Sequence, residues 1–267
     1  MKTAVYTTLY PEAIRFWNDF IQSVEVQSDA DFDLVVCLDN MSVDDVVSGN
    51  VIPHFYLPST KTPSAIRQEC WQHLIDMGYD AIIMVDADDT LAPDRIKKTK
   101  MALQNYDMDV CGLQLVDENL QKMDWTLQPN PDEKTENYII HANDIGLSNT
   151  AYRTEFLQRL IPAPTDIIML DWFLALRAVE EGARISKRQS LDMLYRQYDG
   201  NVANFIPPYT EELVKVQTKR VIAFWESVTP HLGELKIDAE KRLQQIQNKP
   251  ISIPTNIENP KWWGMVG

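Results

Sequence analysis

Three aspartates within four positions are the residues of this sequence best suited to chemistry. Asp86, Asp88 and Asp89 directly follow residues 81–85, an apolar run that suits a strand buried on both faces. Along an extended chain Asp86 and Asp88 point to the same side, about 6.6 Å apart by rise, so their charges repel. Mg²⁺ or Mn²⁺ shared with the phosphates of a ligand would offset this repulsion. The alternative is a solvated turn, because residues 90–94 have the composition of a helix start.

Composition and charge restrict the class of protein. The chain has 267 residues, 45% of them hydrophobic, which is enough for one sizeable α/β core or a domain with an appendage. Its 25 basic and 39 acidic residues give a formal net charge of −14, which repels nucleic acid and anionic membranes at long range. Cys37, Cys70 and Cys111 lack metal-ligand spacing and are interpreted as reduced core thiols. With neither a signal peptide nor 18 consecutive apolar residues, the sequence predicts a soluble cytoplasmic protein.

Alternating strand and helix patterns place the aspartates at one edge of a parallel sheet. Strands are expected at residues 4–9, 33–38, 51–57, 81–85 and 110–116, and helices at 11–23, 62–77 and 93–105. Polar clusters follow the second and fourth of these strands, beginning at Asp39 and Asp86. Open α/β sheets bind ligands outside the carboxyl ends of their strands, so both clusters are expected at one site.

The second half of the chain is less regular. Residues 117–137 are polar and are interpreted as a loop or a small excursion. Short strands are expected at 139–141 and 145–148, helices at 149–160 and 166–181, and late strands at Ile185 and 191–195. After Pro207 the pattern predicts helices at 209–227 and 233–247, then an extended tail. The sequence therefore predicts a main domain at 1–206 and a C-terminal helical extension with an extended tail at 207–267.

Five stretches occur in a fixed order: Leu38-Asp39-Asn40-Met41-Ser42-Val43-Asp44, Ser64-Ala65-Ile66-Arg67-Gln68, Asp86-Ala87-Asp88-Asp89, Leu170-Asp171-Trp172 with Leu176-Arg177, and Tyr195-Arg196-Gln197-Tyr198-Asp199-Gly200-Asn201-Val202. In this order they resemble the motifs of family 2 glycosyltransferases, which have the GT-A fold and move a sugar from a nucleotide diphosphate. The match covers about residues 3–205. Departures are Asn40 and Met41, Leu170 in place of a glutamate, and Tyr198 in place of a histidine that often helps hold the metal.

The resemblance implies an α/β, Rossmann-like GT-A catalytic domain, a mostly parallel sheet flanked by helices. It implies that Asp88 holds a Mn²⁺ or Mg²⁺ ion and that Asp171 is the base that deprotonates the acceptor. Trp172 is expected to stack on an acceptor sugar. The positions assigned to the nucleotide are Thr8, Asp39, Arg67, Asp86 and Arg196. A single in-line displacement by such a site inverts the anomeric carbon.

Each assignment has a structural alternative. Asp171 could be a boundary carboxylate satisfied by Arg177 or Arg153, and Trp172 could be core. Asp39 could cap the following turn, and Arg196 could pair with Asp199. The four histidines are scattered without ligand spacing and none is assigned to the metal.

The expected activity is transfer from a nucleotide-diphosphate sugar, with UDP favoured, to a glycan or lipid-linked acceptor during synthesis of a bacterial surface glycan. A nucleotidyltransferase would carry a Gly-rich basic loop after its first strand, and residues 7–11 are neither Gly-rich nor basic. A catalytically silent nucleotide-sugar-binding protein on the same fold is the other alternative. The helix at 209–227 is expected to pack on the catalytic domain or on a second subunit of a homodimer. Its three basic residues against three acids disfavour docking on a membrane.

Overall fold

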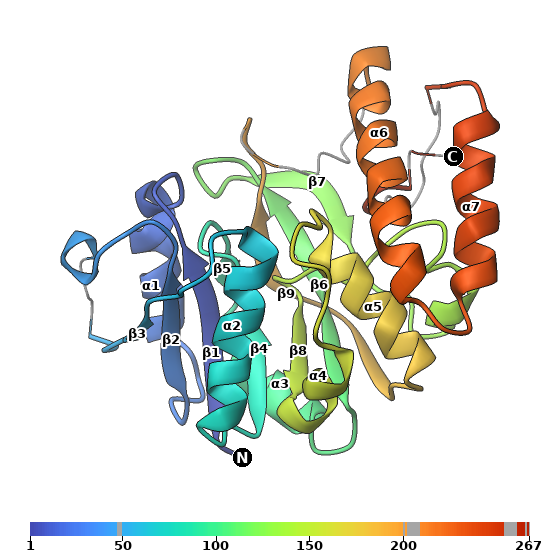
Figure 1. The fold of residues 1–267 in the computed structure, drawn as a ribbon. Coiled ribbons are helices and arrows are strands. Elements are labelled where there is room, and N and C mark those ends of the chain that lie inside the picture. The colour runs from blue at the N-terminus through green and yellow to red at the C-terminus, as the bar shows by residue number, and fades with distance from the viewer. Residues whose placement is uncertain (47–49, 200, 202–208, 254–260, 265, 267) are drawn as a thin grey trace.

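The computed structural model describes residues 1–46, 50–199, 201, 209–253, 261–264 and 266, which form a mixed α/β structure with one large sheet (Figure 1). Its strands are β1 (Thr3–Leu9), β2 (Asp33–Leu38), β3 (His54–Tyr56), β4 (Ala81–Met84), β5 (Thr90–Leu91), β6 (Met108–Val116), β7 (Lys122–Leu127), β8 (Thr150–Arg153) and β9 (Ile185–Arg196). Its α-helices are α1 (Trp17–Glu25), α2 (Pro63–Asp76), α3 (Arg95–Ala102), α4 (Thr154–Leu160), α5 (Leu170–Glu180), α6 (Glu211–Val228) and α7 (Lys236–Asn248). Short 3₁₀ turns lie at Ile14–Phe16, Val43–Asp45, Thr135–Asn137 and Thr229–His231.

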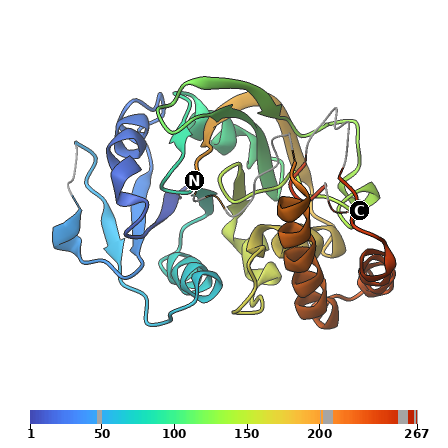
Figure 2. The ribbon, with the colours of Figure 1, turned by 90° about the horizontal axis from the view of Figure 1, so that it is seen from above.

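The first half of the sheet is parallel, in the order β3-β2-β1-β4. Every residue of β1 and β4 is buried, because α1 and α2 cover opposite faces of these strands (Figure 2). The register pairs Tyr6 with Met84 and Thr8 with Cys37, so the carboxyl ends of the three central strands lie at one edge. The α/β arrangement expected from the sequence is confirmed, and it brings Asp39 and Asp86 to that edge.

The second half of the sheet is mixed, with the order continuing through β8, β6, β9 and β5. Strand β8 runs antiparallel to both β4 and β6, whereas β6 and β9 are parallel. The helix expected at 149–160 is therefore wrong in its first part, which is β8, and only Thr154–Leu160 is helical. The apolar positions of this stretch fit both periods, and strand pairing on two sides decided between them.

Three further sequence predictions are corrected by the structure. The stretch 117–137, interpreted as a loop or a small excursion, contains β7, which pairs antiparallel with β6. Thr90, which belonged to the helix start of the alternative interpretation, lies in β5, which pairs with β9. The stretches 139–141 and 145–148 are turns and irregular chain and not strands. Short strands that depend on distant partners leave little signal in their own sequence.

Helices α6 and α7 lie side by side at the end of the molecule away from α1 (Figures 1 and 2), as the sequence predicts for two C-terminal helices. An aromatic cluster joins them to the main body: the ring of Trp172 on α5 stacks on Phe224 with a centroid distance of 4.9 Å and meets Trp225 edge-on at 5.2 Å. The domain boundary that the sequence predicts between residues 206 and 207 lies outside the described residues.

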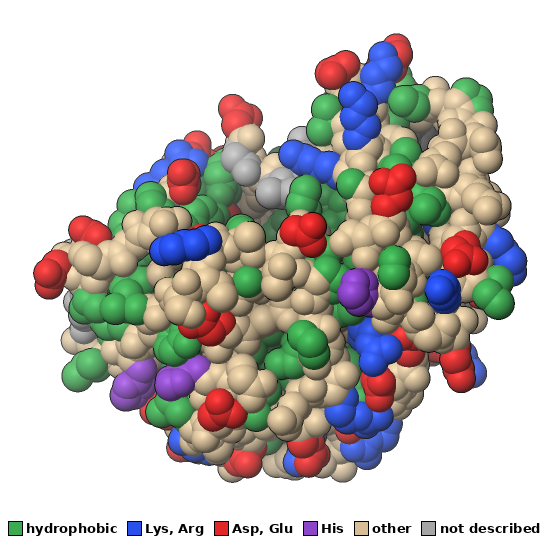
Figure 3. Space-filling view, in the orientation of Figure 1, with side chains coloured by type: hydrophobic (Ala, Val, Ile, Leu, Met, Phe, Trp, Pro, Cys, Tyr) green, Lys and Arg blue, Asp and Glu red, His purple; other side chains and the backbone are tan. Residues whose placement is uncertain are grey.

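Two surface properties concern possible binding partners: the distribution of charged side chains and the apolar character of the helices. Acidic and basic side chains are interspersed over the face shown in Figure 3. Among the described residues, no helix combines the length and the apolar character needed to cross a lipid bilayer.

Candidate functional site

A cavity of about 930 Å³ opens at the carboxyl ends of β1, β2 and β4. This volume is at the upper end of the range for small-molecule sites, which run to roughly 1,000 Å³. One end, which we call the nucleotide end after the sequence prediction, is formed by the chain after these parallel strands and by the start of α2. The other, which we call the acceptor end after the same prediction, is formed by the loop after residue 145, the start of α5 and the C-terminal segment. The lining of the whole cavity includes Thr8, Tyr10, Asp39, Arg67, Asp86, Asp88, Leu147, Ser148, Met169, Asp171, Tyr195, Tyr198, Trp262 and Trp263.

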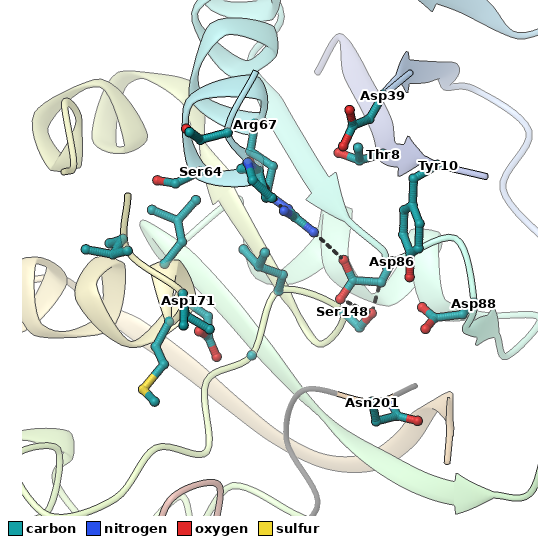
Figure 4. Close-up of a pocket in the computed structure, with 18 of the residues that line it drawn as sticks. Thr8, Tyr10, Asp39, Ser64, Arg67, Asp86, Asp88, Ser148, Asp171 and Asn201 are labelled. Carbon is teal, nitrogen blue, oxygen red and sulfur yellow. Dashed lines mark hydrogen bonds and ion pairs between the residues drawn. The ribbon is translucent and has the colours of Figure 1, made fainter. Parts of the chain in front are cut away.

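Thr8 and Asp39 lie at the nucleotide end, at the carboxyl ends of β1 and β2 (Figure 4). Asn40 has a φ of 55°, in the left-handed region that asparagine tolerates better than most residues, and its amide donates to Asp39 Oδ1 at 2.7 Å. Burial raises the pKa of Asp39, and the charges of Arg67 and Lys61 oppose this rise. The turn after β2 thus holds a carboxylate in the cavity wall, where it can accept hydrogen bonds from a ligand.

Asp86 is held between two groups that come from different elements (Figure 4). Arg67 extends from the first turns of α2, which begins after the cap Thr62, and its Nη2 lies 3.6 Å from Asp86 Oδ1. Ser148 Oγ accepts from the backbone N–H of Asp86 at 2.9 Å and donates to Asp86 Oδ2 at 3.3 Å. The structure therefore brings together three of the positions assigned to the nucleotide, namely Asp39, Arg67 and Asp86, with Thr8 beside them.

Asp88 and Asp89 add negative charge that the fold offsets only in part. Burial and the charge of Asp86 raise the pKa of Asp88 to about 6, against a hydrogen bond that Tyr198 Oη donates to Asp88 Oδ2 at 2.8 Å. Asp89 is 1% exposed, and burial with the neighbouring carboxylates raises its pKa as well. Two raised carboxyl pKa values beside a third acid indicate a place where an added cation would be bound favourably.

The donor set fits a hard divalent cation with few protein ligands. Within the described ranges no group of three or more His, Cys, Asp or Glu residues forms a complete metal cage. Asp88 nevertheless presents carboxylate oxygen to the cavity, and Mg²⁺ and Mn²⁺ are bound through one or two carboxylates when phosphates supply other ligands. Tyr198 contacts Asp88 directly and is suited to orient it.

Arg196 does not lie in the cavity. Its side chain is 1% exposed, its Nε donates to the Asp88 carbonyl at 2.7 Å, and its Nη2 pairs with Asp19 at 2.8 Å. Its backbone N–H donates to Asp89 Oδ1 at 2.8 Å. The assignment of Arg196 to nucleotide phosphate is therefore corrected, because its guanidinium binds the backbone of the acidic turn and the Asp19 carboxylate instead. The ion pair with Asp199 suggested by the sequence is wrong too, since Asp19 is the partner.

Asp171 lies at the start of α5 and faces the acceptor end of the cavity, apart from the acidic turn (Figure 4). Burial raises its pKa to about 7, and the charge of Asp86 adds to this effect, which suits a general base near neutral pH. The alternative of a structural ion pair is not supported, because Arg177 pairs with Glu180 and Glu181, and Arg153 with Glu155. The Nδ2 of Asn143 donates to Asp171 Oδ2 at 3.1 Å.

Trp172 is a core residue and not a platform for an acceptor. It is 0% exposed, its indole N–H donates to the Ile139 carbonyl at 2.6 Å, and its ring stacks on Phe224. The sequence assignment to the acceptor is corrected for a geometric reason: Trp172 follows Asp171 in a helix, so the two side chains point about 100° apart. The aromatic side chains that do line the acceptor end are Tyr195, Trp262 and Trp263.

Sequence reasoning assigned no role to Asn143, Ser148 or the two tryptophans of the tail. Ser148 ends the strand expected at 145–148, Asn143 lies between the two expected short strands, and no motif marks either residue. The pair Trp262-Trp263 in an otherwise polar, proline-marked tail is a signal that could have been used, since such rings need a surface to bury them. Gly200 and Val202, which belong to the last family-like stretch, lie outside the described residues.

Comparisons with known proteins bear on the fold. The sequence matches no protein-family model and no curated protein. The structure is similar to TarS 1–349 of S. aureus in complex with UDP-GlcNAc, with a TM-score of 0.60 and 15% identity over 93% of this chain and 72% of that one. It is also similar to TarS 1–349 in complex with UDP, with a TM-score of 0.58 and 15% identity over 93% and 71% of the two chains.

A second kind of solved structure gives the same result. The mannosyltransferase PcManGT from Pyrobaculum calidifontis, in complex with GDP-Man and Mn²⁺, has a TM-score of 0.58 and 13% identity over 91% of this chain and 69% of that one. The structural similarity establishes a shared fold, but at identities this low the activity has to be argued from the site. The chain therefore has the GT-A glycosyltransferase fold that the sequence predicts.

Proposed function

We propose that this protein transfers a sugar from a nucleotide diphosphate to a hydroxyl acceptor, with inversion at the anomeric carbon. One observation carries the proposal: a single cavity holds a partly offset acidic turn beside Arg67 at one end and a carboxyl with a raised pKa, Asp171, at the other. The first arrangement suits a diphosphate with its cation. The second suits the removal of a proton from an attacking hydroxyl.

The nucleotide end would bind the donor. Asp39 and Thr8 would contact the base and ribose at the ends of β1 and β2, and Asp86 the ribose, with Arg67 supplying fixed positive charge. A UDP-linked sugar is the favoured donor, because TarS, to which the fold is similar, was solved with UDP-GlcNAc and with UDP. The GDP-Man of PcManGT supports a nucleotide-diphosphate sugar as the donor class.

Asp88 would hold a Mn²⁺ or Mg²⁺ ion, with Tyr198 keeping its carboxylate in place through the hydrogen bond to Oδ2. When bound, such an ion offsets the negative charge that the departing diphosphate gains. The Mn²⁺ of PcManGT supports this part of the proposal. The raised pKa of Asp88 adds support, since a bound cation would offset both causes of the rise, burial and the charge of Asp86.

At the acceptor end Asp171 would accept the proton of the attacking hydroxyl. A pKa of about 7 leaves a large fraction of the carboxyl ionised at neutral pH while keeping it basic enough to take the proton. The acceptor, a glycan or a lipid-linked sugar, would lie against Leu147, Met169 and the aromatic side chains of this end. Attack from the side opposite the diphosphate inverts the anomeric carbon.

The proposal also covers the domain bounds, the cellular location of the reaction and the oligomeric state. We place the catalytic domain at residues 1–206, with 207–267 as an extension, and the reaction in the cytoplasm during synthesis of a bacterial surface glycan. A homodimer is a further element of it. The departures at Leu170 and Tyr198 favour a second candidate, a silent protein that binds nucleotide sugar without turnover.

Calorimetric titration of UDP-, GDP- and CMP-sugars with and without Mn²⁺, followed by an assay of donor hydrolysis, tests the proposal. Asp88→Ala should weaken metal-dependent nucleotide binding at least 100-fold, because the protein ligand of the ion is gone. Asp171→Asn should bind within twofold of wild type and lose about 10²- to 10⁴-fold in transfer. Asp124→Ala, on an exposed position of β7, is the control and should change neither.

Equal loss of binding in the Asp88 and Asp171 variants would contradict the separate roles. Binding of UDP-sugar that requires Mn²⁺ but gives no hydrolysis and no transfer would favour the silent protein. Failure of every nucleotide sugar to bind would overturn both candidates.

A further inference from the structure

We propose that Asn143 is a positioning residue for Asp171, and that the C-terminal segment, residues 261–264, holds Asn143 in place. The inference rests on the proposed role of Asp171 as the base and assigns a part in the site to a segment remote in sequence. Asn143 itself does not line the cavity. It would act through the carboxylate that it contacts.

The side chain of Asn143 is fixed on both of its polar atoms. It is 0% exposed; its Oδ1 accepts from the Ile145 N–H at 3.0 Å, and its Nδ2 donates to the Ile145 carbonyl at 2.9 Å. These two bonds identify which side of the amide carries the nitrogen and aim its other N–H at Asp171 Oδ2, 3.1 Å away. A buried amide held by its own loop therefore presents a donor to one oxygen of Asp171. The backbone N–H groups of Asp171 and Trp172 also stabilise the ionised carboxylate.

The C-terminal segment fixes the backbone of Asn143. The Asn143 N–H donates to the Trp262 carbonyl at 3.0 Å, which forms an isolated antiparallel bridge between the two residues. The Trp262 ring meets Tyr195 edge-on at a centroid distance of 5.6 Å. It also packs so closely on Gly146 that an added Cβ would lie 2.7 Å from a ring carbon, which explains a glycine at this position.

A neighbouring residue anchors the segment from the outer side. Lys261 Nζ pairs with Glu133 at 2.9 Å and lies 3.3 Å from the centroid of the Tyr138 ring. Trp263 has a φ of 64°, in the left-handed region, and is 5% exposed. A bulky residue in this conformation is held by its surroundings, so the segment has one defined path beside the cavity.

The charge around Asp171 gives the inference a measurable consequence. Asp171 is influenced by the carboxylate of Asp86 and the guanidinium of Arg67 across the cavity, and Tyr152 of β8 lies near enough to feel its charge. Burial raises the pKa of Asp171 to about 7. A donor on Oδ2 favours the ionised form and lowers this pKa, so removing the donor should raise it further.

The test compares Asn143→Ala and Asn143→Asp with a matched control, Asn149→Ala. Asn149 is also 0% exposed in the same loop, and its side chain bonds to the Gly146 N–H and to the carbonyls of Cys111 and Asp144, without contact to Asp171. Two readouts are used: the ¹³C carboxyl signal of Asp171, assigned by its loss in Asp171→Asn, and the acidic limb of the pH dependence of transfer.

Asn143→Ala should raise the Asp171 titration midpoint from about 7 by about one pH unit, and the acidic limb should move with it. Asn143→Asp should raise it more, because two adjacent carboxyls would share one proton. Trp262→Ala, which removes the ring that packs on Gly146 and Tyr195, should move the midpoint in the same direction by a smaller amount. Asn149→Ala should lower stability and leave the midpoint unchanged.

An unchanged midpoint in Asn143→Ala, or the same shift in Asn149→Ala, would overturn the inference and leave Asn143 a structural residue. The NMR titration needs no turnover. A midpoint that moves as expected in a protein without transferase activity would therefore support the positioning role while contradicting the proposed function.

Discussion

Two clusters of acidic side chains, one partly buried and one fully buried, are built into the same sheet, and their charges are balanced in opposite ways. The first is the acidic turn, Asp86, Asp88 and Asp89, at the cavity. The second, which we call the α3 network, lies where α3 packs on β6 and β9 and consists of Arg95, Lys98, Thr99, Asp109, Arg188, Ser190 and Asp192. Both bury aspartates, but only the second surrounds them with cations.

The α3 network has three basic side chains for two aspartates. Asp109 is 0% exposed and accepts from Arg95, Thr99 and Arg188. Asp192 accepts from Lys98 at 2.7 Å and from Arg188, and its pKa is lowered because these bonds together outweigh the opposing effect of burial. Both carboxylates of this network are thus paired with cations without a ligand, although Arg95 Nε and Nη2 have no hydrogen-bond partner among the described residues.

At the acidic turn the nearest cations serve other purposes. Arg196 donates to backbone carbonyls and to Asp19, and Arg67 reaches only Asp86, at 3.6 Å. The pKa values of Asp88 and Asp89 are accordingly raised, whereas that of Asp192 is lowered. The difference teaches that the number of buried aspartates alone does not indicate a binding site. The better indication is a group of aspartates whose negative charge is not offset by basic side chains of the protein itself.

The largest expected effect breaks the α3 network. Arg188→Ala leaves Asp109 and Asp192 without one of their main partners in a buried setting, which should lower the free energy of unfolding by about 3 kcal/mol. Chemical denaturation with urea measures it, and UDP binding of the folded protein should not change. Arg184→Ala, which removes an exposed ion pair with Asp107, is the control and should cost far less. Similar small losses in both variants would show that the network contributes little stability.

A smaller effect is expected from pH acting on the cavity carboxyls. Folding raises the pKa of Asp88 from 3.8 to about 6 and that of Asp171 from 3.8 to about 7, so the folded chain binds these protons more tightly than the unfolded chain. Their contribution to stability is fully present below about pH 4 and is lost as pH rises through 6 and 7. The Tm of the nucleotide-free protein should fall by about 5 °C between pH 5 and pH 8. A Tm that rises over this interval would contradict the raised pKa values.

The smallest effect sharpens the comparison at one residue. Asp88→Asn keeps an oxygen for the hydrogen bond from Tyr198 and removes a charge that the fold does not offset, so it should raise the Tm of the nucleotide-free protein at pH 7.5 by about 2–4 °C. Asp192→Asn, in the balanced network, should lower the Tm. Mn²⁺ with UDP should stabilise the wild type and not Asp88→Asn. Destabilisation by both substitutions would show that the two clusters are balanced alike.

The nucleotide end could be predicted from the sequence because its residues directly follow strands. Asp39, Asp86 and Asp88 each come after an apolar run, and parallel strands bring their carboxyl ends together whatever the rest of the chain does. Arg67 could also be placed from local sequence, since the cap Thr62 and Pro63 fix where α2 starts. Local patterns were sufficient to bring these four residues to the cavity, but not for Arg196, which was also assigned to the nucleotide and does not line the cavity.

The acceptor end could not be predicted in the same way, because distant segments build it. Asn143 acquires its role from the Trp262 carbonyl and from Asp171, and neither partner is local in sequence. Trp172 was assigned to the acceptor because it follows Asp171, yet only the packing of α6 on α5 decides that its ring is core. Arg196 looked available for phosphate until Asp19 and the carbonyl of Asp88 were placed beside it.

The bridge between Asn143 and Trp262 has a consequence for how the protein comes into use during synthesis. Asp39 and Asp86 follow strands that a ribosome completes early, whereas residue 262 emerges only after both C-terminal helices. Under the proposed roles, the groups that would bind the donor are therefore made well before the segment that fixes Asn143 beside Asp171.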